Sequence, residues 1–467
     1  MKKKLLTISV IITLLFVSCS SDKGPEGFDR DTDYQYQYAS DGGNISWNIQ
    51  TADSDNNLYF VCQNYLMKYD PKNNICKPLC SKANCLHQKE TEEDRKGKCT
   101  AYIPWKPVPK DYNWSYSLFY YKNNIYFAYE AQEGKNDEKN WHIDRISKDG
   151  KSRDRIASWV SNCNEMIQHR GVLYFAREYT DKEGKFYAEL DYLKLDHPGH
   201  IHTLMKPKVS VRSSLKPISA YGKYLYINYC SEDAEAGDDN YLDHFQSAIY
   251  VYNVETKKKT TVHPDGKKQT DMIDNVVPFQ DRIFFTMQDM THAYDLEAKT
   301  FLYSCKPDGS DVKVEKKDIL AWNLLYADKD HLFLSDLNKQ EYQALLASRQ
   351  STGSGNSQQG IESEMGQTGT GSENSFTVTT EVFDKDRKEC DIFTEEGGTY
   401  FPSSDIRIGI GDYRYNLCLN KAGSAYELHK WNKKKLGSLH GQSWTSEVVA
   451  TIPHEDSSDS VVSPKEE

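Results

Sequence analysis

Asn57-Leu58-Tyr59-Phe60 is the first copy of a short pattern that recurs along the chain, an aliphatic residue followed by an aromatic one in an apolar run. Most copies begin 48 to 58 residues after the previous one, and a unit of that length holds four short strands. The seven copies predict a repeated, all-β architecture. The other six are Asn124-Ile125-Tyr126-Phe127, Val172-Leu173-Tyr174-Phe175, Tyr224-Leu225-Tyr226-Ile227, Arg282-Ile283-Phe284-Phe285, His331-Leu332-Phe333-Leu334 and the weaker Asp412-Tyr413-Arg414-Tyr415.

A second signal completes each unit, an apolar residue followed by Asp or Asn. These residues suit tight turns because they tolerate left-handed backbone or bond nearby amide groups. With an inner strand before each first signal, as at 116–121 and 275–279, each unit becomes four antiparallel strands. The turn signals are Tyr69-Asp70, Leu195-Asp196, Tyr252-Asn253, Tyr294-Asp295, Phe383-Asp384 and Trp431-Asn432, with Lys148-Asp149-Gly150 in the second unit.

Seven four-stranded units in a circle form a β-propeller, which leaves only short strand edges exposed. We therefore predict an all-β propeller of seven blades over residues 34–455. Six or eight blades stay open as alternatives, because residues 34–38 could close the ring by joining the last blade. The shared order of the two signals disfavours a sandwich of unrelated hairpins.

The composition fits a strand-rich body. The 467 residues are 38% hydrophobic and 12% aromatic, and 32 of them are tyrosines, which are common in strands. The net charge is −11, with 58 Lys and Arg against 69 Asp and Glu. A protein that coats nucleic acid needs a basic surface. We therefore expect no nucleic-acid partner.

The N-terminus has the features of an export signal. Three lysines precede an apolar run over residues 5–17, which suits a signal peptide and is too short to span a bilayer as a helix. The run ends at Phe16-Val17-Ser18-Cys19, which resembles the lipobox of bacterial lipoproteins, with Phe16 in place of the usual Leu. The resemblance implies cleavage after residue 18 and a diacylglycerol and acyl lipid on Cys19. An ordinary secretory signal with an incidental Cys is the alternative.

Residues 1–18 are thus expected to be a lipoprotein signal peptide, and residues 19–33 a flexible tether. Loss of the three leader lysines takes the net charge to −14, and anionic lipid repels such an acidic chain. We therefore expect the lipid on Cys19 to anchor the protein to the bacterial membrane, outside the cytoplasm. Residues 348–375 are predicted to be a disordered loop and 456–467 an acidic tail.

Five of the eleven cysteines lie close together in sequence, Cys62 and four in an insert over residues 76–101. Within the insert, Cys80-x4-Cys85-x-His87-x11-Cys99 supplies three thiols and one imidazole, the ligand set of a closed, structural zinc site. Disulfides, which an exported protein can form, and unpaired thiols are the alternatives. The remaining cysteines after Cys19 are scattered singly and are predicted to be small buried apolar residues, Cys163, Cys230, Cys305, Cys390 and Cys418.

Three other polar segments resemble metal sites only weakly. His200 and His202 alternate onto one face of a strand, but they occupy a predicted exposed turn. The acidic segments 232–243 and 29–33 lack the spacing of a calcium-binding EF-hand loop. We interpret all three as solvated polar segments. The sequence also has no GxSxG, P-loop, HExxH or dinucleotide-binding motif, so we assign no catalytic residue.

Together these features resemble a set of bacterial propeller lipoproteins with TolB-like blades. The resemblance rests on the lipobox, the hairpins with Tyr-Asp turns, and Leu79-Cys80…Cys85-Leu86-His87…Cys99-Thr100-Ala101 after the first blade. The chain departs from the pattern in its long 348–375 loop and in the longer gap before Cys99. The resemblance implies a fold and a location and no established activity.

We therefore predict a cell-surface-tethered, non-catalytic binding or scaffolding module for a protein, peptide or glycan. The motivating features are the lipid signal, the repeated body and the missing catalytic motifs. The alternative is an extracytoplasmic polysaccharide lyase or hydrolase with Asp, Glu and His residues on one face of the propeller. Propeller enzymes gather such residues from distant parts of the chain, so a missing linear motif leaves this alternative open.

Overall fold

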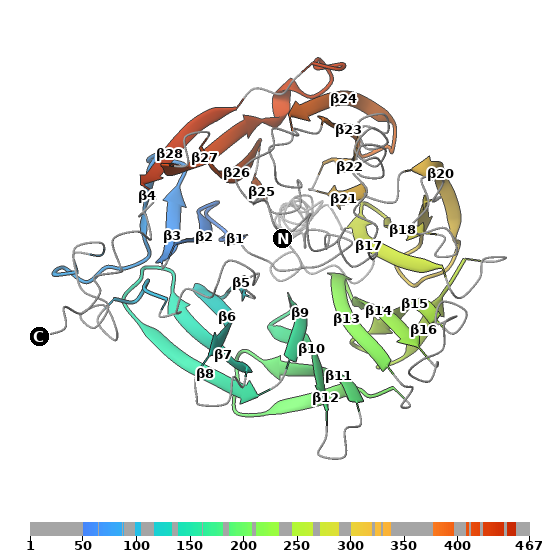
Figure 1. The fold of residues 1–467 in the computed structure, drawn as a ribbon, viewed down its shortest axis with the longest axis horizontal. Coiled ribbons are helices and arrows are strands. Elements are labelled where there is room, and N and C mark those ends of the chain that lie inside the picture. Colours follow the sequence, from blue (N-terminus) through green and yellow to red (C-terminus); the bar gives the residue numbers. More distant parts are fainter. Residues whose placement is uncertain are drawn as a thin grey trace, which may run out of the picture.

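The computed structural model describes residues 50–63, 65–85, 87, 99–103, 116–132, 139–160, 162–180, 186–207, 212–232, 245–264, 271–288, 300–319, 323–327, 330–337, 377–396, 408–410, 412–420, 424–442 and 446–453. These residues form seven antiparallel sheets of four strands each, arranged in a ring (Figure 1). The prediction of an all-β propeller with seven blades is confirmed.

Each blade takes four strands in chain order, from the centre of the ring to its rim (Figure 1). Blades 1 to 3 are β1(Gln50–Ala52), β2(Leu58–Cys62), β3(Tyr65–Asp70), β4(Ile75–Pro78); β5(Tyr116–Tyr121), β6(Asn124–Gln132), β7(Lys139–Ser147), β8(Arg153–Val160); and β9(Asn162–His169), β10(Val172–Thr180), β11(Phe186–Lys194), β12(Ile201–Met205).

The remaining blades repeat the same order. Blades 4 to 7 are β13(Arg212–Tyr221), β14(Tyr224–Glu232), β15(Phe245–Asn253), β16(Lys259–Val262); β17(Met272–Phe279), β18(Arg282–Gln288), β19(Thr300–Cys305), β20(Lys313–Ile319); β21(Asn323–Ala327), β22(Leu332–Leu337), β23(Thr377–Phe383), β24(Glu389–Glu396); and β25(Ile408–Ile410), β26(Tyr413–Leu419), β27(Ala425–Asn432), β28(Glu447–Pro453).

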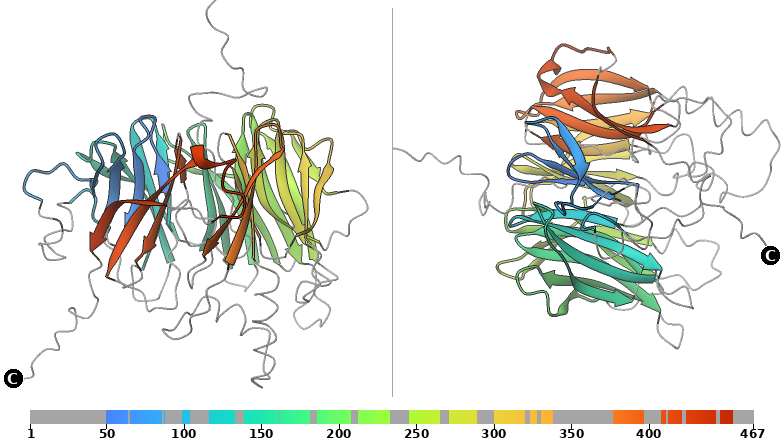
Figure 2. Two further views of the ribbon diagram at one scale, coloured as in Figure 1. Left: turned by 90° about the horizontal axis from the view of Figure 1, so that it is seen from above. Right: turned by 90° about the vertical axis from the view of Figure 1, so that its left-hand side faces the viewer.

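The recurring aliphatic-aromatic pattern forms the second strand of every blade. These strands are apolar on consecutive residues because both faces of a blade pack against its neighbours, as in other sheets covered on two sides (Figure 2). Leu58, Tyr59 and Phe60 on β2 are accordingly all 0% exposed. Six hydrophobic clusters lie between the blades and together span every junction around the ring.

The predicted Asx turns join the third and fourth strands of the blades. In blade 1 the Asp70 carboxylate accepts hydrogen bonds from the amides of Lys72 and Asn73, at 3.0 and 3.2 Å. Asn253, Asp384 and Asn432 accept the corresponding amide bonds in blades 4, 6 and 7.

The turn prediction was wrong in blade 5. Tyr294-Asp295 falls between β18 and β19, outside the described residues, and the β19–β20 turn is built on Asp308 instead. The physical reason is that an Asx residue ends a strand wherever a short turn is needed. An apolar residue followed by Asp or Asn therefore does not indicate which two strands of a blade it joins when the loops between strands differ in length.

Blades 1 and 7 meet at a seam that closes the ring. All four strands of blade 7 come from one continuous stretch, so within the described residues no N-terminal strand joins it. The proposed closing segment 34–38 lies outside the described residues, as do the tether, the 348–375 loop and the acidic tail. No helix in the described part of the chain is long and apolar enough to cross a membrane.

Candidate metal centre

The Cys-rich insert between blades 1 and 2 packs along the outer half of blade 1. The amide of Leu66 on β3 donates to the carbonyl of Ala101 at 2.9 Å, and the amide of Leu79 donates to the carbonyl of Leu66 at 2.8 Å. Tyr65 and Tyr102 also form an isolated antiparallel bridge. The two ends of the insert are thus held beside β3 as extra strand-like pairings.

Gly150, in the turn between β7 and β8, ties the insert to blade 2. Its carbonyl accepts a hydrogen bond from the Thr100 hydroxyl at 2.7 Å and from the Ser81 amide at 3.2 Å. Gly150 has a φ of +72°, and a Cβ at this position would lie 2.8 Å from the carbonyl oxygen of Leu79. Only glycine meets both demands, left-handed backbone and close approach to the insert.

The four predicted ligands converge at this place. Sγ of Cys80, Cys85 and Cys99 and a ring nitrogen of His87 all lie within 4.8 Å of one another. A tetrahedral zinc ion with bonds of about 2.3 Å to sulfur sets its ligand atoms about 3.8 Å apart, so the cluster needs only a small contraction to bind one. Nε2 of His87 is buried and has no hydrogen-bond partner among the described residues. The donor set and this orphaned nitrogen both fit a metal ion.

Two thiols of the cluster have pKa values shifted in opposite directions. Burial opposes ionisation of Cys80, but hydrogen bonds from the Thr100 side chain and from the amides of Lys82 and Thr100 lower the pKa of this thiol to about 6. Burial and the neighbouring charge of Cys80 raise the pKa of Cys99 to about 12. Cys80 is therefore a thiolate at neutral pH, and a bound cation would favour ionisation of Cys99 as well.

The other cysteines stand apart from this group. All nine cysteines described are free thiols. Burial raises the pKa of Cys62 and of Cys76 to about 12, so both are protonated at neutral pH. The scattered cysteines fall one to a blade in blades 3 to 7. Cys163 and Cys305 are buried, as predicted, whereas Cys230 and Cys390 are only half-buried, so for these two the prediction of burial was wrong. The side chain of Cys418 is not described.

The remaining metal candidates do not gather ligands in the described part of the chain. His200 and His202 are exposed, with ring centroids 6.4 Å apart, and His202 stacks on Tyr192. Among the described residues, the Cys3His cluster is the one group of three or more His, Cys, Asp or Glu residues placed to hold a metal. Segments 232–243 and 29–33 fall outside those residues, apart from Glu232 at the end of β14.

A cleft of about 420 Å³ beside the cluster was not predicted from the sequence. The insert supplies Lys82, Cys99, Thr100 and Tyr102 to its lining, and blade 2 supplies Tyr129, Asp144, Lys151, Ser152, Arg153, Asp154 and Arg155. The one available signal was the run Lys151-Ser152-Arg153-Asp154-Arg155, in which charges crowd the start of a strand. That run does not indicate that the strand lies beside the insert.

Two ion pairs to one buried carboxylate lie in the lining of the cleft. The carboxylate of Asp144, 4% exposed, accepts from Arg153 at 2.6 and 2.8 Å and from Arg155 at 2.9 Å. Arg153 also donates to the carbonyl oxygens of Thr100 and Tyr102 in the insert. One guanidinium thus connects Thr100, the residue after the candidate ligand Cys99, to the body of blade 2.

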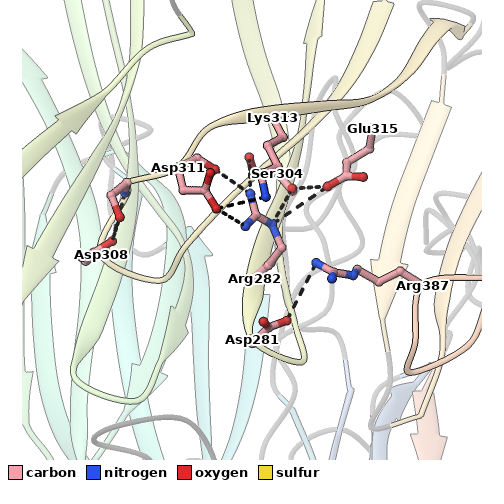
Figure 3. Close-up of polar contacts among 9 residues, drawn as sticks. Asp281, Arg282, Ser304, Asp308, Asp311, Lys313, Glu315 and Arg387 are labelled. Carbon is pink, nitrogen blue, oxygen red and sulfur yellow. Dashed lines mark hydrogen bonds and ion pairs between the residues drawn. The ribbon is translucent and has the colours of Figure 1, made fainter.

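A second polar network lies in blade 5 and connects strands of that blade alone (Figure 3). Arg282, at the start of β18, donates to Ser304 on β19 and to Asp311 in the β19–β20 turn. All its partners belong to the same blade, and its side chain is only 4% exposed. The network fixes the outer hairpin of the blade.

The comparisons with known proteins find similar solved structures but no matching family. No family model matches the chain, and no curated protein matches it. The solved structures similar to it include a proposed 6-phosphogluconolactonase from Bacteroides uniformis, at 10% identity and a TM-score of 0.41 over 90% of this chain and all of that one. Oligopeptidase B from Leishmania major is similar at 8% identity and a TM-score of 0.45, over 89% of this chain and 50% of that one.

The propeller domain of the Trilobed protease from Pyrococcus furiosus is similar at 9% identity and a TM-score of 0.34, covering 72% of this chain and 95% of the domain. The chain spans about half of the length of oligopeptidase B. The assignment of the fold rests on the seven sheets of this chain.

Proposed function

We propose that the chain is a lipid-anchored propeller outside the bacterial cytoplasm that binds or scaffolds a protein, peptide or glycan without chemical turnover. The observation that best supports this proposal is the polar cleft where the insert meets blade 2, carried on a ring of seven four-stranded blades. Surface loops on such a framework are suited to binding.

The binding proposal is tested by crosslinking in intact cells, followed by purification through a C-terminal tag. We expect one protein or glycan to be enriched reproducibly over an untagged control. Enrichment of nothing would contradict binding, and cleavage of a polysaccharide or peptide by the purified chain would contradict the non-catalytic part.

Recovery of the lipidated N-terminal peptide by mass spectrometry tests the anchor, and a Cys19→Ala variant should leave the membrane fraction.

We further propose that Cys80, Cys85, His87 and Cys99 hold one structural zinc ion. The support is the convergence of three sulfurs and one buried, unpartnered imidazole nitrogen. A closed Cys3His site would order the insert and would supply no open position for catalysis.

Metal content measured on the purified chain tests the zinc proposal. We expect about one zinc per chain, loss of it in Cys85→Ser, and no change in Cys390→Ser, a matched half-buried cysteine on β24. Chelation should increase hydrogen exchange in the insert while the blades keep their protection. Mass spectrometry that finds these cysteines oxidised in pairs would overturn the proposal.

A further inference from the structure

We propose that the Cys3His cluster is a redox switch, in which Cys80 and Cys85 exchange metal binding for a disulfide bond. This inference rests on the proposed zinc site and on the proposed location outside the cytoplasm, and it adds the regulation of that site. Outside the cytoplasm thiols are exposed to oxidation, so thiols this close together either hold a metal or pair with one another. The cluster can reach both states because its three cysteines are free thiols.

The distances within the cluster are compatible with either state. The three sulfur atoms lie within 4.8 Å of one another, whereas the two sulfurs of a disulfide are about 2.05 Å apart. Two of them therefore have to approach by less than about 3 Å, a shift that rotation of cysteine side chains between rotamers can supply. The thiol of Cys85 hydrogen-bonds with those of Cys80 and Cys99, so it lies between its two possible partners.

The surroundings of the three cysteines select the pair. Cys99 is only 5% exposed, and hydrogen bonds of the next residue, Thr100, fix it to blade 2. Cys80 and Cys85 are half-buried, and the residues between them, 81–84, are all exposed. The exposed segment can adjust to a new bond at less cost than the buried one. We therefore expect a Cys80–Cys85 disulfide, with Cys99 as the remaining thiol.

The oxidation needs an acceptor of two electrons, and hydrogen peroxide is the simplest one. The two sulfurs each give up one electron, and the S–S bond forms as the O–O bond of the peroxide breaks. The oxygens leave as two molecules of water, with protons from the thiols or from the solvent. Only His87 and Cys99 then remain as ligands, and two ligands do not make a closed zinc site. A dithiol reductant reverses the reaction and restores both thiols.

Disulfide mapping by mass spectrometry tests the switch. The full chain, purified with a reductant, is either loaded with zinc or stripped by a chelator, and is then treated with hydrogen peroxide. We expect a Cys80–Cys85 disulfide in the stripped chain and its formation at least tenfold more slowly in the loaded chain. Zinc release, followed with a chelating dye, should match disulfide formation, and a dithiol reductant should restore zinc binding. Equal rates with and without zinc, or sulfinic acids in place of a disulfide, would overturn the inference.

Two variants separate the switch from the zinc site. Cys99→Ser keeps the pair and lacks one ligand, so zinc should protect its Cys80 and Cys85 less than in wild type. Cys390→Ser, which changes a half-buried cysteine on β24, should form the same disulfide at the wild-type rate. A disulfide that includes Cys99 would overturn the choice of pair. Oxidised pairs found before peroxide is added would count against the zinc site itself, whereas a loaded chain that loses no zinc to peroxide would overturn the switch alone.

Discussion

At the scale of single residues, Asp391 shows how one buried carboxylate joins two blades. Asp391 lies on β24 of blade 6, and its side chain is fully buried. Its oxygens accept from the amides of Gly437, Leu439 and His440, which follow β27 of blade 7, at 2.7, 3.1 and 2.8 Å. Burial opposes the charge, but these amide bonds outweigh it and lower the pKa of Asp391.

Asp391→Asn should therefore lower the free energy of unfolding by about 3 kcal/mol at neutral pH, because an amide nitrogen would face backbone donors. The folded pKa lies below the unfolded value of about 3.9, so the carboxylate stabilises the fold above that value. This stabilisation is lost as the pH falls through the folded pKa. Urea unfolding at pH 7 and at pH 3 should show a gap between wild type and variant that narrows at the lower pH.

The control is Asp386→Asn, an exposed position in the same hairpin. Its free energy of unfolding should equal that of wild type at both pH values. A gap between wild type and Asp391→Asn that stays constant with pH would show that the charge of Asp391 is not what the amides stabilise.

Residues whose role depends on local spacing could be predicted from the sequence, and those that need a distant partner could not. Cys80, Cys85, His87 and Cys99 fall within a short insert, so their ligand types and spacing were enough to indicate one cluster. Asp144 and Arg153 read as ordinary charged residues in strands. Their role appears only when the fold places the insert carbonyls of Thr100 and Tyr102 beside them.

At the scale of elements, the outer hairpin of blade 5 is held by a buried arginine (Figure 3). Nε of Arg282 donates to the Ser304 hydroxyl at 2.7 Å, and Nη1 donates to Asp311 at 2.9 Å. Glu315 on β20 accepts from the same hydroxyl. The network joins β18, β19 and β20 in the blade where the predicted turn signal was misplaced. The periodicity of the sequence therefore predicted the blade but not the hydrogen bonds that fix its outer turn.

Arg282→Met should lower the free energy of unfolding by about 2 to 3 kcal/mol, less than for a fully buried pair, because the acidic partners are about one third exposed. Lys313→Met removes the exposed cation of the same network and should change stability by less than about 0.5 kcal/mol. Thermal and urea unfolding compare the two variants. Equal effects would show that the burial of Arg282 contributes nothing of its own.

At the scale of the whole molecule, side-chain packing closes the ring between blades 7 and 1. The hydrophobic cluster at this seam contains residues of blades 7, 1 and 2 together with the insert, and Cys80 and Cys85 pack against it. The rings of Tyr69 and Tyr415 meet across the seam with centroids 5.6 Å apart. The candidate metal cluster therefore lies against the hydrophobic core that closes the ring.

Tyr415→Ala should open this seam before any other part of the ring. Removing a fully buried aromatic side chain costs about 3 to 5 kcal/mol. The described strands of blades 1 and 7 share side-chain packing and a hydrogen bond from the Gln63 side chain to the Pro453 carbonyl, but they do not pair as strands. We therefore expect the loss to appear as faster hydrogen exchange in β1–β4 and β25–β28. Tyr226→Ala, an equally buried tyrosine in the cluster between blades 4 and 5, should cost a similar free energy and raise exchange in those blades instead. If both variants raised exchange evenly around the ring, the propeller would unfold as one unit and the seam would not be its weakest junction.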